Sequence, residues 1–192
     1  MAAFSAGGRG FRMTAQLAPG RQERVATLLG WALFIVFFAL FINIVTLPRT
    51  ALDQREALRM WHDSLGFLLF FLVLVRLWWW FSGPKPQKPE ALSAASFNFN
   101  RALLLAFLLV FAVEGLIGPF YAWSEDRDVG FFGVFLPRLM APNENVRMAT
   151  GYMHSALGFY YMMLGTLWLF YGAYQQFRYR AGWRRLFPGA AV

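Results

Sequence analysis

Four apolar runs, each about as long as a lipid bilayer is thick, follow one another along the chain, with shorter polar segments between them. The runs are roughly Val25–Leu47, Met60–Phe81, Arg101–Ala122 and Met148–Phe177. A helix needs roughly 20 mainly apolar residues to cross about 30 Å of hydrocarbon. Proline and glycine, which interrupt helices, follow the first two runs. The pattern therefore predicts an all-α membrane protein with a bundle of four transmembrane helices.

The segments between the runs are too short to separate domains, so we expect one membrane unit over residues 21–180. Residues 1–20 are rich in Gly, Ala and Ser and predict a flexible tail, whereas residues 181–192 predict a basic cytoplasmic tail. The longest connection, Trp123–Arg147, contains the apolar stretch VGFFGVFLPRLM, which is too short for a fifth span. We expect it to lie on the outer membrane face over the bundle, either as a hydrophobic cap or as part of a ligand site.

Composition supports the membrane interpretation, because 58% of the residues are hydrophobic and 19% are aromatic. The chain has no cysteine, which excludes disulfides, iron–sulfur clusters and covalently attached haem. A formal charge of +8 raises the question of nucleic acid. The basic residues flank apolar runs, however, so lipid headgroups explain them better, and no nucleic-acid partner is expected.

The distribution of Lys and Arg predicts the orientation in the membrane. Of the 18 Lys and Arg residues, twelve lie on the side of the two termini and of the connection between the second and third spans. The six on the opposite side are Arg49, Arg55, Arg59, Arg127, Arg138 and Arg147. This excess predicts that both termini are cytoplasmic.

The two histidines of the chain, His62 and His154, lie in the second and fourth runs. Both runs enter the membrane from the outer side. If their helices begin near Arg55 and Met148, each histidine lies on the order of 10 Å deep at about 1.5 Å per residue. Facing imidazoles at matched depth are what a six-coordinate haem b requires. The alternative is that each histidine only forms a hydrogen bond across the bundle.

Small residues accompany both histidines. Gly66 and Gly158 each lie four residues after a histidine, which places them on the same helical face, one turn deeper. A haem plane needs space at that position, and glycine leaves it. The alternative is that these glycines serve close helix packing, as small residues commonly do in membranes.

Three charged residues are further candidates for the site. Glu114 is the one acid inside the third run, and it is a weak candidate for accepting a proton from quinol, holding an axial imidazole or pairing with an arginine. A structural hydrogen bond is its alternative role. Arg59 and Arg147 are candidate partners of haem propionates, through charge-assisted hydrogen bonds. The alternative for both is contact with lipid headgroups.

The spacing of His62, Gly66 and Arg76, H-x3-G-x9-R, resembles the bacterial cytochrome b561 family. The resemblance continues through PKPQKP after the second run, GLIG at Gly115–Gly118, FFGVFLP in the long connection and His154. It implies a four-span haem b protein of the bacterial inner membrane. The family is a di-haem one and includes superoxide:ubiquinone oxidoreductases.

The sequence departs from this family at two positions. The first span of the family reads R-x5-H-W, whereas here Arg24 is followed at that distance by Gly30 and then Trp31. Trp168 stands fourteen residues after His154, where the family has its second ligand in the fourth span. Both ligands of the cytoplasmic-side haem are thus absent together. The resemblance therefore implies one haem b on the outer side, held by His62 and His154, with Trp168 filling part of the vacated volume.

We interpret the chain as a membrane cytochrome that transfers single electrons at the periplasmic face, to or from quinone or superoxide. Its partners would be the lipid bilayer and one of these small molecules. The alternative is an accessory or docking subunit of a larger respiratory or photosynthetic complex, in which the haem is structural or vestigial. A haem-free scaffold with two hydrogen-bonding histidines is the third interpretation.

Overall fold

The computed structural model describes residues 21–179, except for residues 84, 86–87 and 89. The predicted tails, residues 1–20 and 181–192, lie outside the described residues. The long helices are α1 (Arg21–Thr46), α2 (Arg55–Ser82), α3 (Ala94–Ser124) and α5 (Leu157–Tyr179), with the shorter α4 (Glu144–Gly151) and a π-helical turn, η3 (Tyr152–Ala156), leading into α5. Two short 3-10 turns, η1 (Leu47–Arg49) and η2 (Leu52–Gln54), connect α1 to α2. The prediction of an all-α membrane bundle is confirmed.

Three helical segments are long and apolar enough to cross a membrane: Arg24–Arg49, Leu52–Ser82 and Ala94–Ser124. The fourth predicted span corresponds to α4, η3 and α5, which follow one another without a break from Glu144 to Tyr179. Its mean hydropathy is lower than that of these three segments, because tyrosines and glycines alternate with its leucines and phenylalanines. The fourth helix is therefore the least apolar member of the bundle.

The helices extend beyond the apolar runs because polar residues cap them. The Ser93 side chain accepts a hydrogen bond from the Ser96 backbone N–H at 3.1 Å and starts α3 several residues before the apolar run. The Asn143 side chain accepts one from the Val146 N–H at 3.1 Å and starts α4 in the same way. Hydropathy alone locates the buried part of each helix, whereas the caps determine where it begins.

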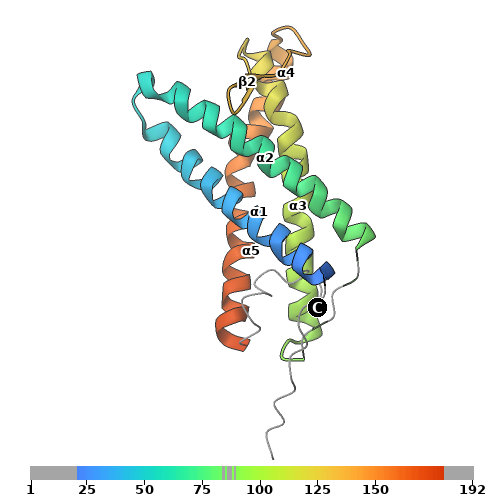
Figure 1. Ribbon diagram of the computed structural model, residues 1–192. Coiled ribbons are helices and arrows are strands. Elements are labelled where there is room, and N and C mark those ends of the chain that lie inside the picture. The colour runs from blue at the N-terminus through green and yellow to red at the C-terminus, as the bar shows by residue number, and fades with distance from the viewer. Residues whose placement is uncertain (1–20, 84, 86–87, 89, 180–192) are drawn as a thin grey trace, which may run out of the picture.

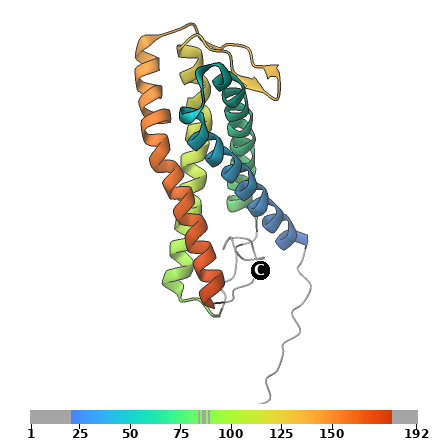
Figure 2. The ribbon, with the colours of Figure 1, turned by 90° about the vertical axis from the view of Figure 1, so that its left-hand side faces the viewer.

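The bundle consists of two antiparallel hairpins that cross at an angle (Figure 1). In one hairpin α1 packs along α2, in the other α3 packs along α5, and α2 packs on α3 across the crossing. The start of α1 and the end of α5 lie at the same end of the bundle, as an even number of spans requires (Figure 2). The Asn43 amide donates to the Leu58 carbonyl at 2.9 Å and ties α1 to α2 near the opposite end.

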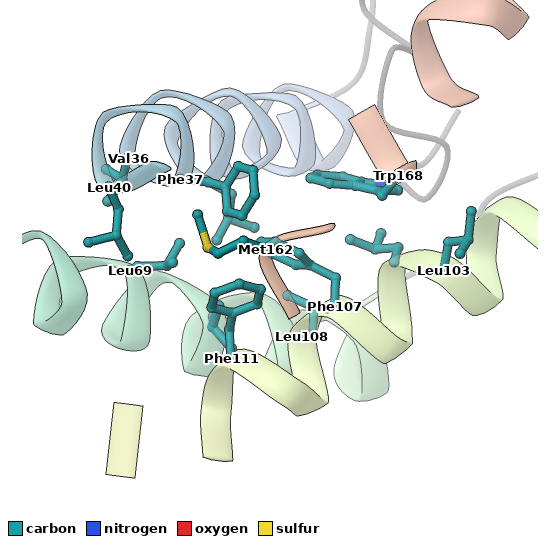
Figure 3. Packing of buried hydrophobic residues seen from close by; sticks show 13 residues of the cluster. Val36, Phe37, Leu40, Leu69, Leu103, Phe107, Leu108, Phe111, Met162 and Trp168 are labelled. Atoms are coloured by element: carbon teal, nitrogen blue, oxygen red, sulfur yellow. The ribbon is translucent and has the colours of Figure 1, made fainter. Parts of the chain in front are cut away.

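The hydrophobic core lies where the two hairpins cross. Its largest members are aromatic, and Trp168, Phe37 and Phe107 are each at most 1% exposed. Figure 3 shows these rings together with Met162 and Phe111 between the helices. The Trp168 and Phe107 ring centroids are 5.0 Å apart and the planes are inclined by 30°. A close-packed core of this kind leaves little space for another molecule.

The connection between α3 and α4 contains a short antiparallel hairpin of two strands, β1 (Gly130–Phe131) and β2 (Val134–Phe135), each two residues long. Its turn uses positive φ at Phe132 and Gly133, of 48° and 88°. The Phe132 N–H donates to the Ser64 hydroxyl at 2.9 Å, and the Gly130 backbone forms a hydrogen bond with the Asp63 side chain. The hairpin therefore lies against α2 at one end of the bundle and forms no fifth span.

Candidate functional site

His62 of α2 and His154 of η3 face each other near the end of the bundle that carries the hairpin. Their ring centroids are 5.9 Å apart, and the ring planes are nearly perpendicular at 87°. The predicted meeting of the two histidines across the bundle is present in the structure. They come from two different hairpins, so the crossing of the hairpins positions this pair.

The distance between the rings suits a shared metal ion. An imidazole nitrogen lies about 2 Å from a bound metal, so two rings on opposite sides of one metal have centroids on the order of 6 Å apart. The observed 5.9 Å agrees with that separation. Within the described residues there is no group of three or more His, Cys, Asp or Glu side chains that could hold a metal ion. The donor set is therefore a pair of imidazoles, as in bis-histidine haem ligation.

His154 lies in the π-helical turn, which the sequence did not predict. A π turn inserts about one extra residue into an α-helix and is frequently found at functional sites. Here the extra residue changes the direction in which the following helix presents its side chains. No signal in the sequence marks such a turn, because it depends on how α4 and α5 each pack against α3.

The two predicted glycines leave open space beside the histidines. A β-carbon built at Gly66 or at Gly158 would meet no atom within 4 Å. The glycines of α3 behave differently: a β-carbon at Gly118 would lie 3.0 Å from Cε1 of His154, and one at Gly115 would collide with Phe70. The glycines with open space beside them, Gly66 and Gly158, are therefore the two that were predicted to make room for a haem. Gly115 and Gly118 of α3 instead permit close packing.

Glu114 approaches His154 from α3. It is 7% exposed, and its Oε2 lies 2.9 Å from Nδ1 of His154. The two atoms are at ion-pair distance, although the N–H direction of the ring does not meet the angular requirement of a hydrogen bond. The structure thus brings together His62, His154 and Glu114, which the sequence had only named separately.

The two arginines predicted as propionate partners differ in what they contact, and Arg59 stands three residues before His62. Arg59 is exposed on α2. Arg147 donates two hydrogen bonds to Glu144, at 2.7 Å and 2.6 Å, and this pair lies before the predicted fourth span. These bonds from Arg147 lower the pKa of the Glu144 carboxyl. Arg147 is therefore already engaged by an acid on its own helix.

Sequence reasoning missed two residues next to the histidines. The charge of Arg127 acts on both His62 and Asp63, so this guanidinium lies near the site. It also lies 6.0 Å from the ring of Tyr121, whose centroid is 6.1 Å from that of His154. Arg127 is one of several charged residues in the segment SEDRD, and nothing in that segment distinguishes it from its neighbours.

The donor set and the space around it fit a haem. Nδ1 of His62 is buried and has no hydrogen-bond partner among the described residues, which costs free energy unless another group binds the ring. Gly66 and Gly158 supply open space one turn from the two imidazoles. Two imidazole nitrogen donors facing each other, with open space one turn away, are suited to hold haem iron without a covalent link.

Comparison with known proteins shows the family to which the chain belongs. A family model described as prokaryotic cytochrome b561 matches residues 21–189. No curated protein matches the chain. The family binds haem b and carries out electron transfer in membranes. Because the match covers the whole bundle, including both histidines, the chain belongs to the prokaryotic cytochrome b561 family of membrane b-type cytochromes.

Proposed function

We propose that this cytochrome holds a single haem b between His62 and His154 and transfers single electrons at the periplasmic face. The observation that carries the proposal is the facing pair of imidazoles at 5.9 Å. The proposed ligands are one nitrogen from each ring, and Gly66 and Gly158 leave the space that the macrocycle needs. When bound between two imidazoles, haem b supplies reversible one-electron transfer with no open coordination position.

The aromatic core of the bundle supports a count of one haem. Trp168, which replaces the family's second ligand on the fourth span, is 1% exposed and packs on Phe107. Leu33 and Phe37, shortly after Gly30 on α1, belong to the same core and are at most 1% exposed. Side chains thus occupy a region in which a second macrocycle would need space.

A single site near one end of the bundle confines electron exchange to that side. The excess of Lys and Arg assigns the end with both termini to the cytoplasm, so the histidine pair lies toward the periplasm. Quinone, which reaches the site from the bilayer, and superoxide, which reaches it from water, are the proposed small-molecule partners. The cell membrane that fits this arrangement is the bacterial inner membrane, and an oxidoreductase activity with either molecule follows.

The experiment that tests this proposal measures haem per chain and its spectrum. The full chain is purified from membranes in detergent, and pyridine haemochrome is measured together with a reduced-minus-oxidised spectrum. We expect one haem b per chain, low-spin in both oxidation states. Two haems would contradict the count of one, and none would contradict the haem site itself. Reduction by superoxide or quinol is then followed at the same absorbance band.

One observation favours a second candidate function, that of an accessory subunit in a larger membrane complex. Tyr160 lies near the middle of the continuous helix Glu144–Tyr179, and it is 64% exposed. A hydroxyl group that faces hydrocarbon without a hydrogen-bond partner costs free energy. A neighbouring helix that accepts this hydrogen bond would remove the cost. The haem would then be structural or would serve the larger complex.

Purification in a mild detergent separates the two functions. A subunit co-migrates with a larger complex on native gels and shows no reaction with superoxide or quinol when isolated. An independent cytochrome migrates alone and reacts. Tyr160→Phe is the matched variant: it should weaken association if the hydroxyl binds a partner helix, and it should change nothing if lipid covers this face.

A further inference from the structure

Glu114, Gly118 and Tyr121 form one face of α3 that surrounds the ring of His154. They are spaced four and three residues apart, so they follow one another along the same side of the helix. The Glu114 carboxylate lies at Nδ1 of the imidazole, Gly118 lies beside Cε1 and the Tyr121 ring lies 6.1 Å away. This face holds one edge of the imidazole, and the ring remains free to direct its other nitrogen elsewhere.

An acid at this position requires an explanation. Glu114 is the one acid in α3, it is 7% exposed, and it lies in the apolar part of the helix. Its second oxygen, Oε1, has no hydrogen-bond partner among the described residues. A carboxylate inside the membrane is costly and is retained where it has a specific partner. The partner that the structure offers is Nδ1 of His154, at 2.9 Å.

We propose that Glu114 is a positioning residue for His154, which it holds through Nδ1, and that its negative charge lowers the midpoint potential of the bound haem. The proposal rests on the haem site described above. Nδ1 already lies within hydrogen-bonding distance of Glu114, at 2.9 Å from Oε2. A carboxylate that accepts this bond fixes the ring and makes the other nitrogen a stronger donor to the metal. Both effects, together with the charge itself, favour oxidised over reduced iron.

The test is a redox titration of detergent-purified full-length protein, unmodified and with Glu114→Gln. Glutamine keeps the size of the side chain and an oxygen acceptor but removes the charge. We expect haem content to remain that of the unmodified chain. The midpoint potential should rise by about 59 mV or more, which is a tenfold change in the ratio of oxidised to reduced haem for one electron. The electron paramagnetic resonance signal of the oxidised form should change with it, because it reports the strength of the axial ligands.

Two further variants make the result specific. Glu114→Asp restores the charge on a shorter side chain and should return the potential part of the way. Asp63→Asn removes a negative charge from the residue next to His62, but that carboxylate bonds to the Gly130 backbone and not to an imidazole. It should shift the potential less than Glu114→Gln does.

The outcomes separate this inference from the proposed function. An unchanged potential and spectrum in Glu114→Gln, with haem fully bound, would overturn the positioning role and leave the haem site intact. An equal shift in Asp63→Asn would overturn it as well, because a general effect of charge would then be sufficient. Absence of haem from the unmodified chain would overturn the proposed function itself.

Discussion

A β-carbon built at Gly158 meets open space, whereas one built at Gly165 collides with Phe37. The two glycines are seven residues apart and therefore lie on nearly the same face of the fourth helix. Near the histidines, the bundle thus keeps open space at Gly66 and Gly158, although Gly115, Gly118 and Gly151 at that end are closely packed. The rest of the bundle, from the crossing of the hairpins toward the termini, fills that space with Phe37, Phe107 and Trp168. Gly158 and Gly165 lie on the same face of one helix, so the difference in the space beside them arises from the residues of the other helices that pack against that face.

The same comparison extends to polar groups. In the half with the histidines, Nδ1 of His62 and Oε1 of Glu114 are buried without hydrogen-bond partners among the described residues. In the other half, the amide nitrogen of Asn100 donates to the Gln175 side-chain oxygen at 2.6 Å, and both residues are at most 2% exposed, but Oδ1 of Asn100 is also buried without a hydrogen-bond partner among the described residues. Unpaired buried polar atoms therefore occur in both halves, and those near the histidines differ in lying beside the facing pair of imidazoles.

The largest effect is expected from removing either imidazole. His62→Ala and His154→Ala should each abolish haem binding, because each removes one of the two nitrogen donors proposed to hold the iron. The measurement is pyridine haemochrome per chain in detergent extracts. Trp168→Phe is the control in the other half and should retain full haem content. Haem retained in both histidine variants would place the cofactor elsewhere.

The second-largest effect is expected from filling the open space beside Gly158. Gly158→Leu should lower haem content at least tenfold, because the larger side chain occupies the space beside His154, while the fold is retained. Gly165→Leu should instead leave the haem site intact and lower the free energy of unfolding by about 1–3 kcal/mol, because the side chain overpacks against Phe37. Haem content and thermal unfolding are measured on both. Equal haem loss in the two variants would show that the halves do not differ as described.

These two glycines also show how far sequence reasoning extends. The position of Gly158 four residues after His154 predicted space beside the histidine, because helical spacing alone determines that relation. The collision at Gly165 was not predictable, since it depends on Phe37 of another helix. The π turn at His154 and the closeness of Arg127 to His62 were missed for the same reason. The periodicity of the sequence predicts which side chains lie on one face of a helix. Which side chains of the other helices contact that face depends on how the helices pack.

Removing an aromatic side chain of the core should affect stability alone and leave the haem site unchanged. Trp168→Ala should lower the free energy of unfolding by about 3–5 kcal/mol, because it leaves a large cavity between Phe107 and the rest of the core. For a chain of this size that corresponds to a fall of on the order of 10 °C in Tm. Haem content at room temperature should not change. A fall in haem content without a fall in Tm would mean that the two halves are coupled.

The smallest effect concerns the buried pair Asn100 and Gln175, which joins α3 to α5 in the half without histidines. Asn100→Ala, Gln175→Ala and the double variant form a thermodynamic cycle that isolates the pair from each side chain's own packing. Hydrogen bonds between membrane helices average about 0.6 kcal/mol in such cycles, because the separated helices also find partners. We expect a coupling of about that size, measured by unfolding in detergent with the spectrum as the probe of the haem. The midpoint potential should stay unchanged in all three variants, because the pair has no contact with either histidine. A change in potential of the size expected for Glu114→Gln would show that the two halves of the bundle are linked through α3, along which both Glu114 and Asn100 lie.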